Sequence, residues 1–427
     1  MSGVINGAVV NAPLGQLPRL LPAGPAPGLA QHLTRHGPPP GPLSDQGRAE
    51  LMAEVERSGL TGRGGAGFPA ARKLAAVRQS YRRCHTPVAV ANGTEGEPAS
   101  AKDKILLARS PHLVLDGAAI AADLIGARQA LIVAPHPVRD VVADAIAERV
   151  ARGPEPIRWR VITAAEGFVA GEASAVVHWI SRGIPAPTAT PPRLAERGLH
   201  GAPTLVNNVE TLAHLALIAR YGADWFRAIG TVSEPGSMLV TVLGAVRQPG
   251  VYETAVGTPV REVLDLAGGP SQPLRALLIG GYSGSWVNAE TACDRPFSAA
   301  GLADLGAAVG AGMVAALPED ACGLAETARV ARYLAGQSAG QCGPCRFGLD
   351  AIAGAVEQLA GGRTTDISLL DRWLSQVAGR GACGHPDGVV RLVRSALAEF
   401  ADERERHASS WCCGGASVLP VPPGGLR

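Results

Sequence analysis

Cysteines are the residues of this sequence with the clearest chemical potential. Cys342 and Cys345 form a Cys-Gly-Pro-Cys pair, and Cys383 lies well downstream within Gly381–His385. Three chemistries use such a set: a thioredoxin-like dithiol, a zinc site that includes His385, or a [4Fe–4S] cluster, which needs a fourth ligand. The strand and the tryptophan expected before a redox dithiol are absent from the sequence. The spacing therefore favours zinc and the cluster equally, with the dithiol behind them.

A glycine-dense segment could bind an anion. Its candidate ligand-binding residues are Gly62, Arg63, Gly64, Gly65, Gly67 and Phe68. Glycines let the backbone approach a phosphate, and the helix expected after them offers free N–H groups. Arg63 and Lys73 add positive charge. The segment matches G-x-G-x-x-G, but a dinucleotide fingerprint should follow a strand, and this one follows a predicted helix. An ordinary tight loop with solvated charges is the alternative.

A polar segment, Asn92–Pro98, follows a predicted strand over Pro87–Ala91. Ligand contacts in α/β folds gather at the carboxyl ends of parallel strands. Asn92 can both donate and accept hydrogen bonds. Glu95 and Glu97 could orient a ribose or a nicotinamide, which makes them the candidate catalytic residues. The alternative is an acidic turn without a ligand.

Two side-chain amides, Asn207 and Asn208, precede another predicted helix within Thr204–Thr211. Asparagines at such positions are commonly helix caps, so this segment by itself says little about ligand binding.

The elements around these residues alternate between strands and helices. Ser44 and Gly59 predict the start and stop of a helix. The remaining predicted elements up to residue 221 are helices at 70–82, 111–125, 138–151, 172–181 and 209–221, strands at 87–91, 130–134 and 157–163, and a glycine turn at 167–171. This alternation predicts a parallel sheet covered on both faces.

The composition changes after that region. Short β-rich pieces between residues 237 and 288, with a helix over Val260–Ala267, predict one small α+β module. Residues 319 to 404 carry apolar residues at helical spacing, including Leu349, Ile352 and Val356. The proline- and glycine-rich ends predict an N-terminal arm and a loose C-terminal tail.

The bulk composition limits the classes of function. Hydrophobic residues make up 46% of the 427 residues and charged residues 18%, so a large buried core is expected. The net charge of +2 gives no reason to expect nucleic acid as a partner. Asp116, Asp123 and Arg128 interrupt the longest apolar stretch. With no secretion signal at the N-terminus, a soluble, cytoplasmic protein without membrane insertion is expected.

Taken together in this order, the segments resemble the FMN- and NADH-binding subunit of respiratory complex I. Similar subunits occur in NAD-reducing hydrogenases and formate dehydrogenases. The likeness runs from about Gly59 to about Phe400, and it is carried by Gly62–Pro69, Asn92–Pro98, Gly201–Thr211, Gly310–Gly312, Gly340–Arg346 and Cys383. Several motifs that agree in order are more specific than any one of them.

The resemblance implies an α/β Rossmann-like flavin domain, then a β-grasp (soluble-ligand-binding) module and a C-terminal helical iron–sulfur domain. The expected boundaries are a Pro/Gly-rich arm at 1–43, the FMN/NADH-binding domain at 44–230, the β-grasp module at 237–290, the [4Fe–4S] domain at 319–405 and a flexible tail at 406–427.

The resemblance also implies an electron path from NADH through FMN to a [4Fe–4S] cluster, and on to a ferredoxin, a [2Fe–2S] protein or other subunits of a redox complex. Gly62, Arg63, Gly64 and Lys73 would hold the FMN phosphate. The ribityl chain and ring would be surrounded by Asn92, Glu95, Gly171, Glu172, Asn207, Asn208 and Thr211. Phe68 and Glu97 would lie on the NADH side. Cys342, Cys345 and Cys383 would bind the cluster.

This chain departs from the family pattern at several positions. Ala339 stands where the family has a cluster cysteine, and the candidate substitutes are Ser338, His385, Cys322, Cys412 and Cys413. Near the flavin, the departures are Phe168, Ala173 and Thr94, and on the NADH side they are Thr190, Arg193 and Ala76. Two other functions therefore stay open: an FMN and iron–sulfur protein that no longer binds NADH, and a non-enzymatic scaffold with a zinc site.

Overall fold

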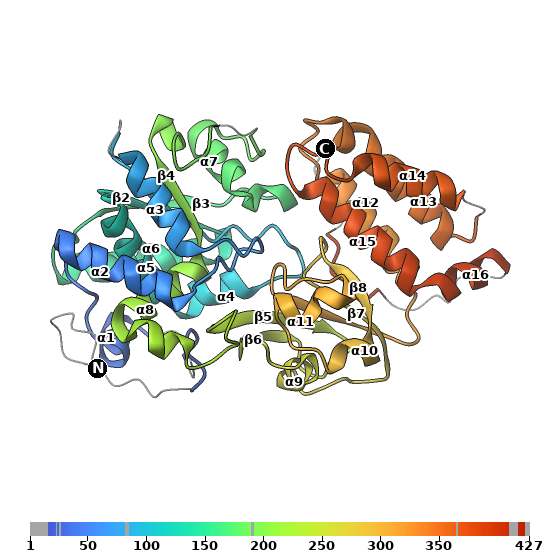
Figure 1. Ribbon diagram of the computed structural model, residues 1–427, viewed down its shortest axis with the longest axis horizontal. Coiled ribbons are helices and arrows are strands. Elements are labelled where there is room, and N and C mark those ends of the chain that lie inside the picture. Colours follow the sequence, from blue (N-terminus) through green and yellow to red (C-terminus); the bar gives the residue numbers. More distant parts are fainter. Residues whose placement is uncertain are drawn as a thin grey trace.

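The structure is a computed structural model that describes residues 16–22, 24, 27–81, 85–188, 192–363, 366–409 and 417–422. Its elements form three consecutive regions (Figure 1): a parallel sheet with helices, a mixed sheet with short helices, and a set of C-terminal helices. The mixed α/β architecture expected from the sequence is confirmed at this level.

The first region is built on a four-stranded sheet in the order β3-β2-β1-β4. Its strands are β1 (Val88–Asn92), β2 (Gln129–Ala134), β3 (Arg158–Thr163) and β4 (Thr204–Asn208), and all pair in parallel. In the β1–β4 pair, Asn92 is the register partner of Asn208. The polar residues at the ends of these two strands therefore meet at one edge of the sheet.

Helices cover both faces of this sheet. The helices of the region are α1 (Leu29–His36), α2 (Asp45–Ser58), α3 (Ala70–Tyr81), α4 (Lys102–Arg109), α5 (Pro111–Ile125), α6 (His136–Arg152), α7 (Ala173–Arg182) and α8 (Val209–Arg227). Ala89 and Ile132 pack into the core shared with α5 and α8, whereas the next residues, Val90 and Val133, pack on the other face with Val176 of α7. The alternation follows from the period of two in a strand.

Sequence analysis predicted most of these elements but missed α1, α4 and β4. Helix α2 has Ser44 as N-cap and Gly59 as C-cap, as expected. The segment that forms β4 was interpreted only as a helix cap. Asn208 is indeed the N-cap of α8, but it is also the last residue of a buried strand that pairs with β1. That pairing comes from residues far away in the sequence, which local pattern does not reveal.

The N-terminal segment, expected to be an arm or linker, contains helix α1 and a tightly held stretch before it. The side chain of His32 contacts Asp116 at 2.7 Å inside the core. Three successive backbone N–H groups, those of Arg19, Leu20 and Leu21, donate to the Glu253 carboxylate at 2.9, 2.8 and 3.3 Å. The prolines mark this stretch as irregular, but distant partners bury it.

The second region has a five-stranded sheet in the order β6-β5-β9-β7-β8. Its elements are β5 (Ser237–Gly244), β6 (Gly250–Ala255), α9 (Val260–Leu266), β7 (Leu274–Ile279), β8 (Ser285–Asn288), α10 (Ala289–Cys293), α11 (Ala299–Leu302) and β9 (Met313–Pro318). Strand β9 lies between β5 and β7, so the sheet extends beyond the expected end at residue 290.

The third region is helical, as predicted. It consists of α12 (Gly323–Gly336), a π-helical turn (Pro344–Gly348), α13 (Leu349–Ala360), α14 (Ile367–Val377), α15 (His385–Glu399) and α16 (Ala401–Ser409). Residues 417–422, expected to be a loose tail, are held in place: the N–H groups of Val418 and Leu419 donate to Glu326, and Tyr282 donates to the Pro420 carbonyl.

Within the described ranges, no single helix has the length and apolar character needed to cross a bilayer. Helices α4 and α5 meet that criterion only as a pair, and the pair is bent by 96°.

The contact between α5 and α8 yields a test of the fold. A Cβ atom on Gly117 would lie 1.8 Å from the Leu212 carbonyl oxygen, which is main chain and cannot rotate away. We expect Gly117→Ala to lower the free energy of unfolding by about 3 kcal/mol or more, measured by urea unfolding followed by circular dichroism. The matched control is Gly354→Ala in α13, where the nearest atom is the Arg332 side chain at 3.7 Å. That variant should gain about 1 kcal/mol. Equal stability of Gly117→Ala and wild type would contradict the packing described.

Candidate functional site

The carboxyl ends of β1 and β4 form the floor of the candidate site. The Asn92 side chain donates from Nδ2 to the Gly171 carbonyl at 2.9 Å and accepts from the Thr94 N–H at 3.0 Å. Asn208 accepts from the Glu210 N–H at 2.9 Å, as an N-cap, and donates to Asp103 at 2.7 Å. Both amides therefore hold neighbouring loops in place.

Asn207 differs from its two neighbours at this edge. It is buried, yet its side-chain amide makes no hydrogen bond to any residue that the structure describes. Its amide atoms are not among the fully buried unpaired atoms of the described residues, so they keep some exposure at this edge. Asn207 is thus available to a ligand at the edge of the sheet.

The glycine segment lies directly over this edge. The N–H of Arg63 donates to Thr211 Oγ1 of α8 at 2.9 Å, and the Gly62 N–H donates to the Phe68 carbonyl at 2.9 Å. A Cβ on Gly64 would lie 3.3 Å from Asn208. Gly65 has a φ of +100°, which only glycine adopts readily. The loop is tight and held by its own backbone, and its predicted role in binding a phosphate stays a prediction.

Two cations beside this loop lack a full set of partners. Lys73, on α3, has no hydrogen bond or ion pair with any described residue, and burial lowers its pKa against the opposing effect of Glu172. Burial also lowers the pKa of Arg63, whose Nη2 donates to the Pro235 carbonyl while Nε has no partner. An incompletely paired, poorly hydrated cation is costly unless an anion reaches it. Lys73 is thus the side chain beside the loop that is left for an anion, whereas the Arg63 guanidinium also contacts Thr61 and Pro235.

Glu95, one candidate catalytic residue, accepts hydrogen bonds from the first turn of α4. Its carboxylate accepts from Ser100 Oγ at 2.6 Å and from the N–H groups of Asp103 and Lys104 at 3.2 and 3.3 Å. Burial and the charge of Asp103 raise the pKa of Glu95. The side chain is therefore a helix cap in this structure, at the floor of the candidate site.

Glu97, the second candidate, joins the first region to the second. One carboxylate oxygen accepts from the Tyr282 N–H at 2.8 Å, and the other is buried without a partner in the described residues. Burial raises the pKa of Glu97 to about 8. The carboxyl therefore serves in this structure as a buried link between the two regions.

The turn Gly167–Gly171 connects the loop region to the C-terminal helices. A Cβ on Gly96 would lie 2.5 Å from the Phe168 carbonyl, so this approach needs glycine. The Phe168 N–H donates to Gln337 at 3.0 Å, and its ring lies 5.5 Å from that of His385. Glu172 then caps α7, accepting from the Ser174 and Ala175 N–H groups. The turn thus contacts the Asn92–Pro98 segment of the first region and Gln337 of the C-terminal helical region.

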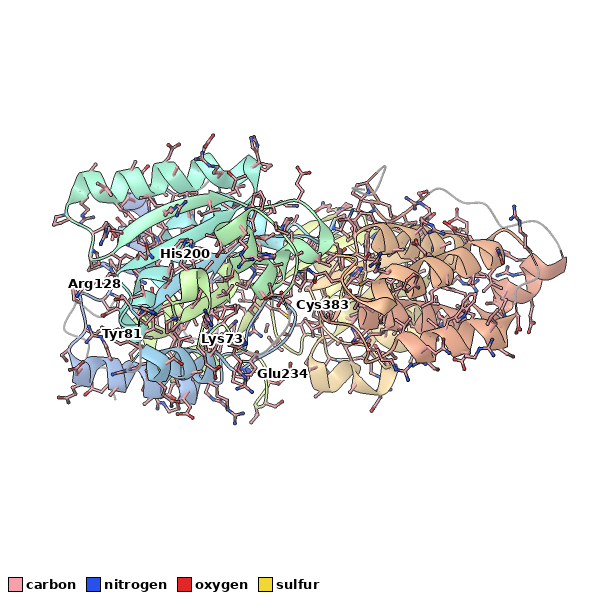
Figure 2. The ribbon with its side chains drawn as sticks, turned by 90° about the horizontal axis from the view of Figure 1, so that it is seen from above. Lys73, Tyr81, Arg128, His200, Glu234 and Cys383 are labelled. Atoms are coloured by element: carbon pink, nitrogen blue, oxygen red, sulfur yellow. The ribbon has the colours of Figure 1, made fainter. Side chains whose placement is uncertain are left out.

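The three predicted thiols gather on the far side of that turn. Burial, and then a hydrogen bond with Cys342, raise the pKa of Cys345 to about 12. Burial also raises the pKa of Cys383, and the charge of Glu172 and that of Cys342 act in the same direction. Burial would raise the pKa of Cys342 too, but hydrogen bonds with Ala382 and Cys345 leave it lowered. These mutual effects place the thiols together, beside Glu172. Figure 2 shows Cys383 near the middle of the molecule, between the parallel-sheet region and the C-terminal helices.

The donor set fits a cluster better than a single ion. Across the described ranges, no three His, Cys, Asp or Glu side chains are placed to share one metal ion. Zinc requires its four donors around one centre. An iron–sulfur cluster spreads its thiolates over several irons. The zinc arrangement considered from sequence, with His385 joining the three cysteines around one ion, is therefore not formed here.

The proposed substitutes for the missing thiolate lie in different places. Cys322 is the N-cap of α12, with its sulfur 3.5 Å from Glu403 and 3.6 Å from His407. Ser338 and Ala339 follow the other end of that helix and are partly exposed. Other sequence-level departures are also placed: Arg193 and Ala76 are exposed, whereas Thr190, Cys412 and Cys413 lie outside the described residues.

Sequence reasoning missed a buried ionic network beneath the floor. Lys102 Nζ lies 2.9 Å from Asp103 and 2.8 Å from Glu210, and all three side chains are almost fully buried. Glu210 also accepts the Leu239 N–H of β5 at 2.9 Å. A lysine next to an aspartate is ordinary on a surface, so one sequence offers no signal for this network.

Three family profiles match this chain. Residues 55–217 match the Nuo51 FMN-binding domain, residues 239–281 the SLBB domain, and residues 325–407 the iron–sulfur binding region of NADH-ubiquinone oxidoreductase-F. Their order agrees with the three regions of the fold.

Similar proteins cover most of the chain. The F subunit of the NADH-quinone oxidoreductase of Streptomyces coelicolor is 31% identical over 380 residues, which is 85% of this chain and 84% of that protein. The F 2 subunit of the Rhizobium meliloti enzyme is 31% identical over 387 residues, 85% of this chain and 90% of that one. Among solved structures, an NAD⁺-reducing [NiFe]-hydrogenase in the H₂-reduced state matches with a TM-score of 0.78 and 32% identity over 84% of this chain. This chain spans 63% of the length of that hydrogenase chain.

The raised pKa of Glu97 gives stability a distinctive dependence on pH. In the unfolded chain this carboxyl ionises near its ordinary pKa of 4.5, whereas in the folded chain it keeps its proton up to about 8. Between these values the unfolded state binds fewer protons, so the free energy of unfolding falls by about 1.4 kcal/mol per pH unit. Glu97→Gln should remove this fall, so the variant gains stability relative to wild type between about pH 5 and about pH 8. Urea unfolding across this range measures the difference. The exposed Glu290→Gln is the control, and parallel pH curves for Glu97→Gln and wild type would refute the burial argument.

Proposed function

The chain belongs to the family of the NADH-quinone oxidoreductase F subunits, and from that premise we propose how its own residues serve an iron–sulfur flavoprotein that oxidises NADH. When bound, FMN would supply a hydride acceptor for NADH, and a [4Fe–4S] cluster would supply one-electron transfer. The protein holds, orients and insulates these groups. Its partners are other subunits of a redox complex, with a ferredoxin or a [2Fe–2S] protein as the proposed acceptor.

One observation carries the assignment. Glu172, the residue directly after the turn Gly167–Gly171, acts electrostatically both on Lys73 at the glycine loop and on Cys383 among the thiols. Asn92 holds the carbonyl of Gly171, and the charge of the next residue, Glu172, reaches Cys383. A flavin phosphate and an iron–sulfur cluster are the groups that these two halves suit, and electron transfer requires them to be close.

Different residues at the loop are proposed to contact different parts of FMN. Arg63 and Lys73 would neutralise the phosphate, and the backbone of Gly62, Gly64, Gly65 and Gly67 would approach it without side chains in the way. The remaining contacts, to the ribityl chain and ring, are proposed for Asn92, Glu95, Gly171, Glu172, Asn207, Asn208 and Thr211. Of these, Asn207 has the amide most clearly left for a ligand.

NADH would enter over the exposed side of the loop. Phe68 is 52% exposed there and offers a face on which a ring can stack. Glu97, proposed for the same side, has one carboxyl oxygen that is buried and that no described residue pairs with. These two residues are the proposed orienting groups for the hydride donor.

The finer architecture is also a proposal. We assign the parallel sheet to a Rossmann-like fold over residues 44–230, the mixed sheet to a β-grasp module from 237, and the helices of 319–405 to the cluster domain. Strand β9 supports extending the β-grasp module to Pro318. The cysteines that the structure describes carry free thiols, which supports a reducing, cytoplasmic setting.

Electrons would leave on the exposed side of the cluster. Phe347, two residues after Cys345, is 73% exposed. An exposed aromatic beside a redox centre is suited to contact with a partner protein.

Anaerobic titration tests the function directly. We expect NADH to bleach the oxidised flavin absorbance of the purified full chain at close to one equivalent. A chain that carries FMN and iron but stays oxidised with NADH would instead be an electron-transfer protein without a dinucleotide site. A colourless preparation that contains zinc would leave only a scaffold role and end the proposal.

The phosphate contact is testable with a matched pair on α3. Lys73→Ala removes a charge-assisted contact worth about 1.5–3 kcal/mol, so the Kd for FMN should rise about 10-fold to 100-fold. Arg72→Ala, one residue earlier on the same helix and exposed, should bind FMN as wild type does. Quenching of FMN fluorescence during titration into flavin-free protein measures both. Equal losses for the two variants would mean a general charge effect and not a phosphate site.

A further inference from the structure

The cluster lacks one of its expected ligands, because Ala339 has no donor atom. We propose that His385, through Nδ1, binds the iron that Ala339 leaves without a thiolate. The inference rests on the proposed function, since it concerns the same cluster, and it assigns three thiolates and one imidazole to this chain.

His385 is held as one tautomer. Its Nε2 lies 2.8 Å from the main-chain carbonyl oxygen of Leu334 in α12. A carbonyl can only accept a hydrogen bond, so Nε2 must carry the proton. In a neutral imidazole the other nitrogen, Nδ1, then has a free lone pair and no proton. This is the form in which histidine binds a metal.

The lone pair on Nδ1 accepts no hydrogen bond from any described residue. His385 is 6% exposed, and Nδ1 is buried without a hydrogen-bond partner among the described residues. An unpaired buried acceptor costs about 1–3 kcal/mol. Histidines that bind metals show the same pattern: one nitrogen donates to a carbonyl or carboxylate, and the other faces the metal.

The His385 ring lies close in the chain to a proposed cluster ligand. His385 is the first residue of α15 and lies two residues after Cys383, whose sulfur accepts a hydrogen bond from the His385 backbone. Nδ1 is bonded to Cγ and is therefore the ring nitrogen nearer to that backbone. The ring of Phe168 packs 5.5 Å away, and the bond to Leu334 fixes the other edge. The ring is thus held in one orientation, two residues after a proposed cluster ligand.

The other candidates are weaker. Cys322 stands at the opposite end of α12 from the loop that contains Ala339, and 14 helical residues separate them. At 1.5 Å per residue that distance is about 21 Å, too far for one cluster. Ser338 lies next to Ala339 but is partly exposed, and its hydroxyl is a poorer iron ligand than an imidazole or a thiolate.

A neutral imidazole in place of an anionic thiolate changes the cluster itself. The net charge of the centre becomes one unit less negative, which favours the reduced state and raises the reduction potential. We expect His385→Cys, which restores a thiolate, to lower the potential relative to wild type.

The decisive measurement uses the unaltered full chain. Protein is produced anaerobically with natural histidine or with ¹⁵N-histidine, and the reduced cluster is studied by pulsed electron paramagnetic resonance. We expect a directly coordinated nitrogen, with a coupling that changes from the ¹⁴N to the ¹⁵N pattern. Because no residue is changed, the result does not depend on whether a variant folds.

Variants then locate the nitrogen. His385→Leu should lose the coupling and, on brief oxidation, fall from about four irons per chain toward three, with the resonance of a three-iron cluster. The control His178→Leu removes another histidine whose ring nitrogen bonds a main-chain carbonyl, at Ala186, and should keep both the coupling and the iron.

The outcomes separate this inference from the function. A wild-type cluster that NADH reduces but that shows no histidine nitrogen would overturn the ligand assignment and leave the function intact. The same holds if His385→Leu keeps the coupling, or if Ser338→Ala or a Cys412→Ser, Cys413→Ser double variant is the one that loses an iron. A wild-type chain that assembles no cluster at all, with iron and sulfide absent, would overturn the function as well.

Discussion

The arrangement of the whole site depends on how closely two loops approach at the edge of the parallel sheet. The Asn92 loop and the turn Gly167–Gly171 touch main chain to main chain, and a Cβ on Gly96 would collide with the Phe168 carbonyl at 2.5 Å. Asn92 then ties the two together through Gly171. The turn also contacts Gln337 at the end of α12, so this approach links the edge of the parallel sheet to the C-terminal helices.

Beneath that contact, charge positions the regions more than it stabilises them. Lys102, Asp103 and Glu210 are buried together, and removing three charges from water costs about as much as their attraction returns. The network orients neighbouring elements. Glu210 also accepts a hydrogen bond from the Leu239 N–H in the second sheet, and Asp103 accepts one from the Asn208 side chain. Neighbouring elements can satisfy these groups in only one arrangement. Glu97 adds a second such link through Tyr282.

The sequence predicted elements that depend on local chemistry and missed those that depend on distant partners. Ser44 and Gly59 mark α2 correctly because capping is a property of adjacent residues. The glycine loop and the cysteine pair were recognised for the same reason. Strand β4, the docking of residues 19–21 on Glu253, and the capping role of Glu95 were not visible, since each is decided by residues far along the chain. The proline-rich ends were expected to be loose because local pattern cannot report burial.

The same distinction explains how a cluster ligand can change place while the rest of the site persists. Ala339 lies in a partly exposed loop after α12, where losing a side chain disturbs little packing. His385 begins a helix with Pro386 at its first turn, is held by the Leu334 carbonyl, and follows Cys383 closely. Moving a donor from the loop to this helix start would place two of four ligands two residues apart, with Cys383 just before α15 and His385 at its first position, so less chain must be ordered around the metal. The flavin side, set by the Gly96 contact, is untouched by such an exchange. The arrangement of the flavin site relative to the cluster site is therefore compatible with a changed ligand at the cluster.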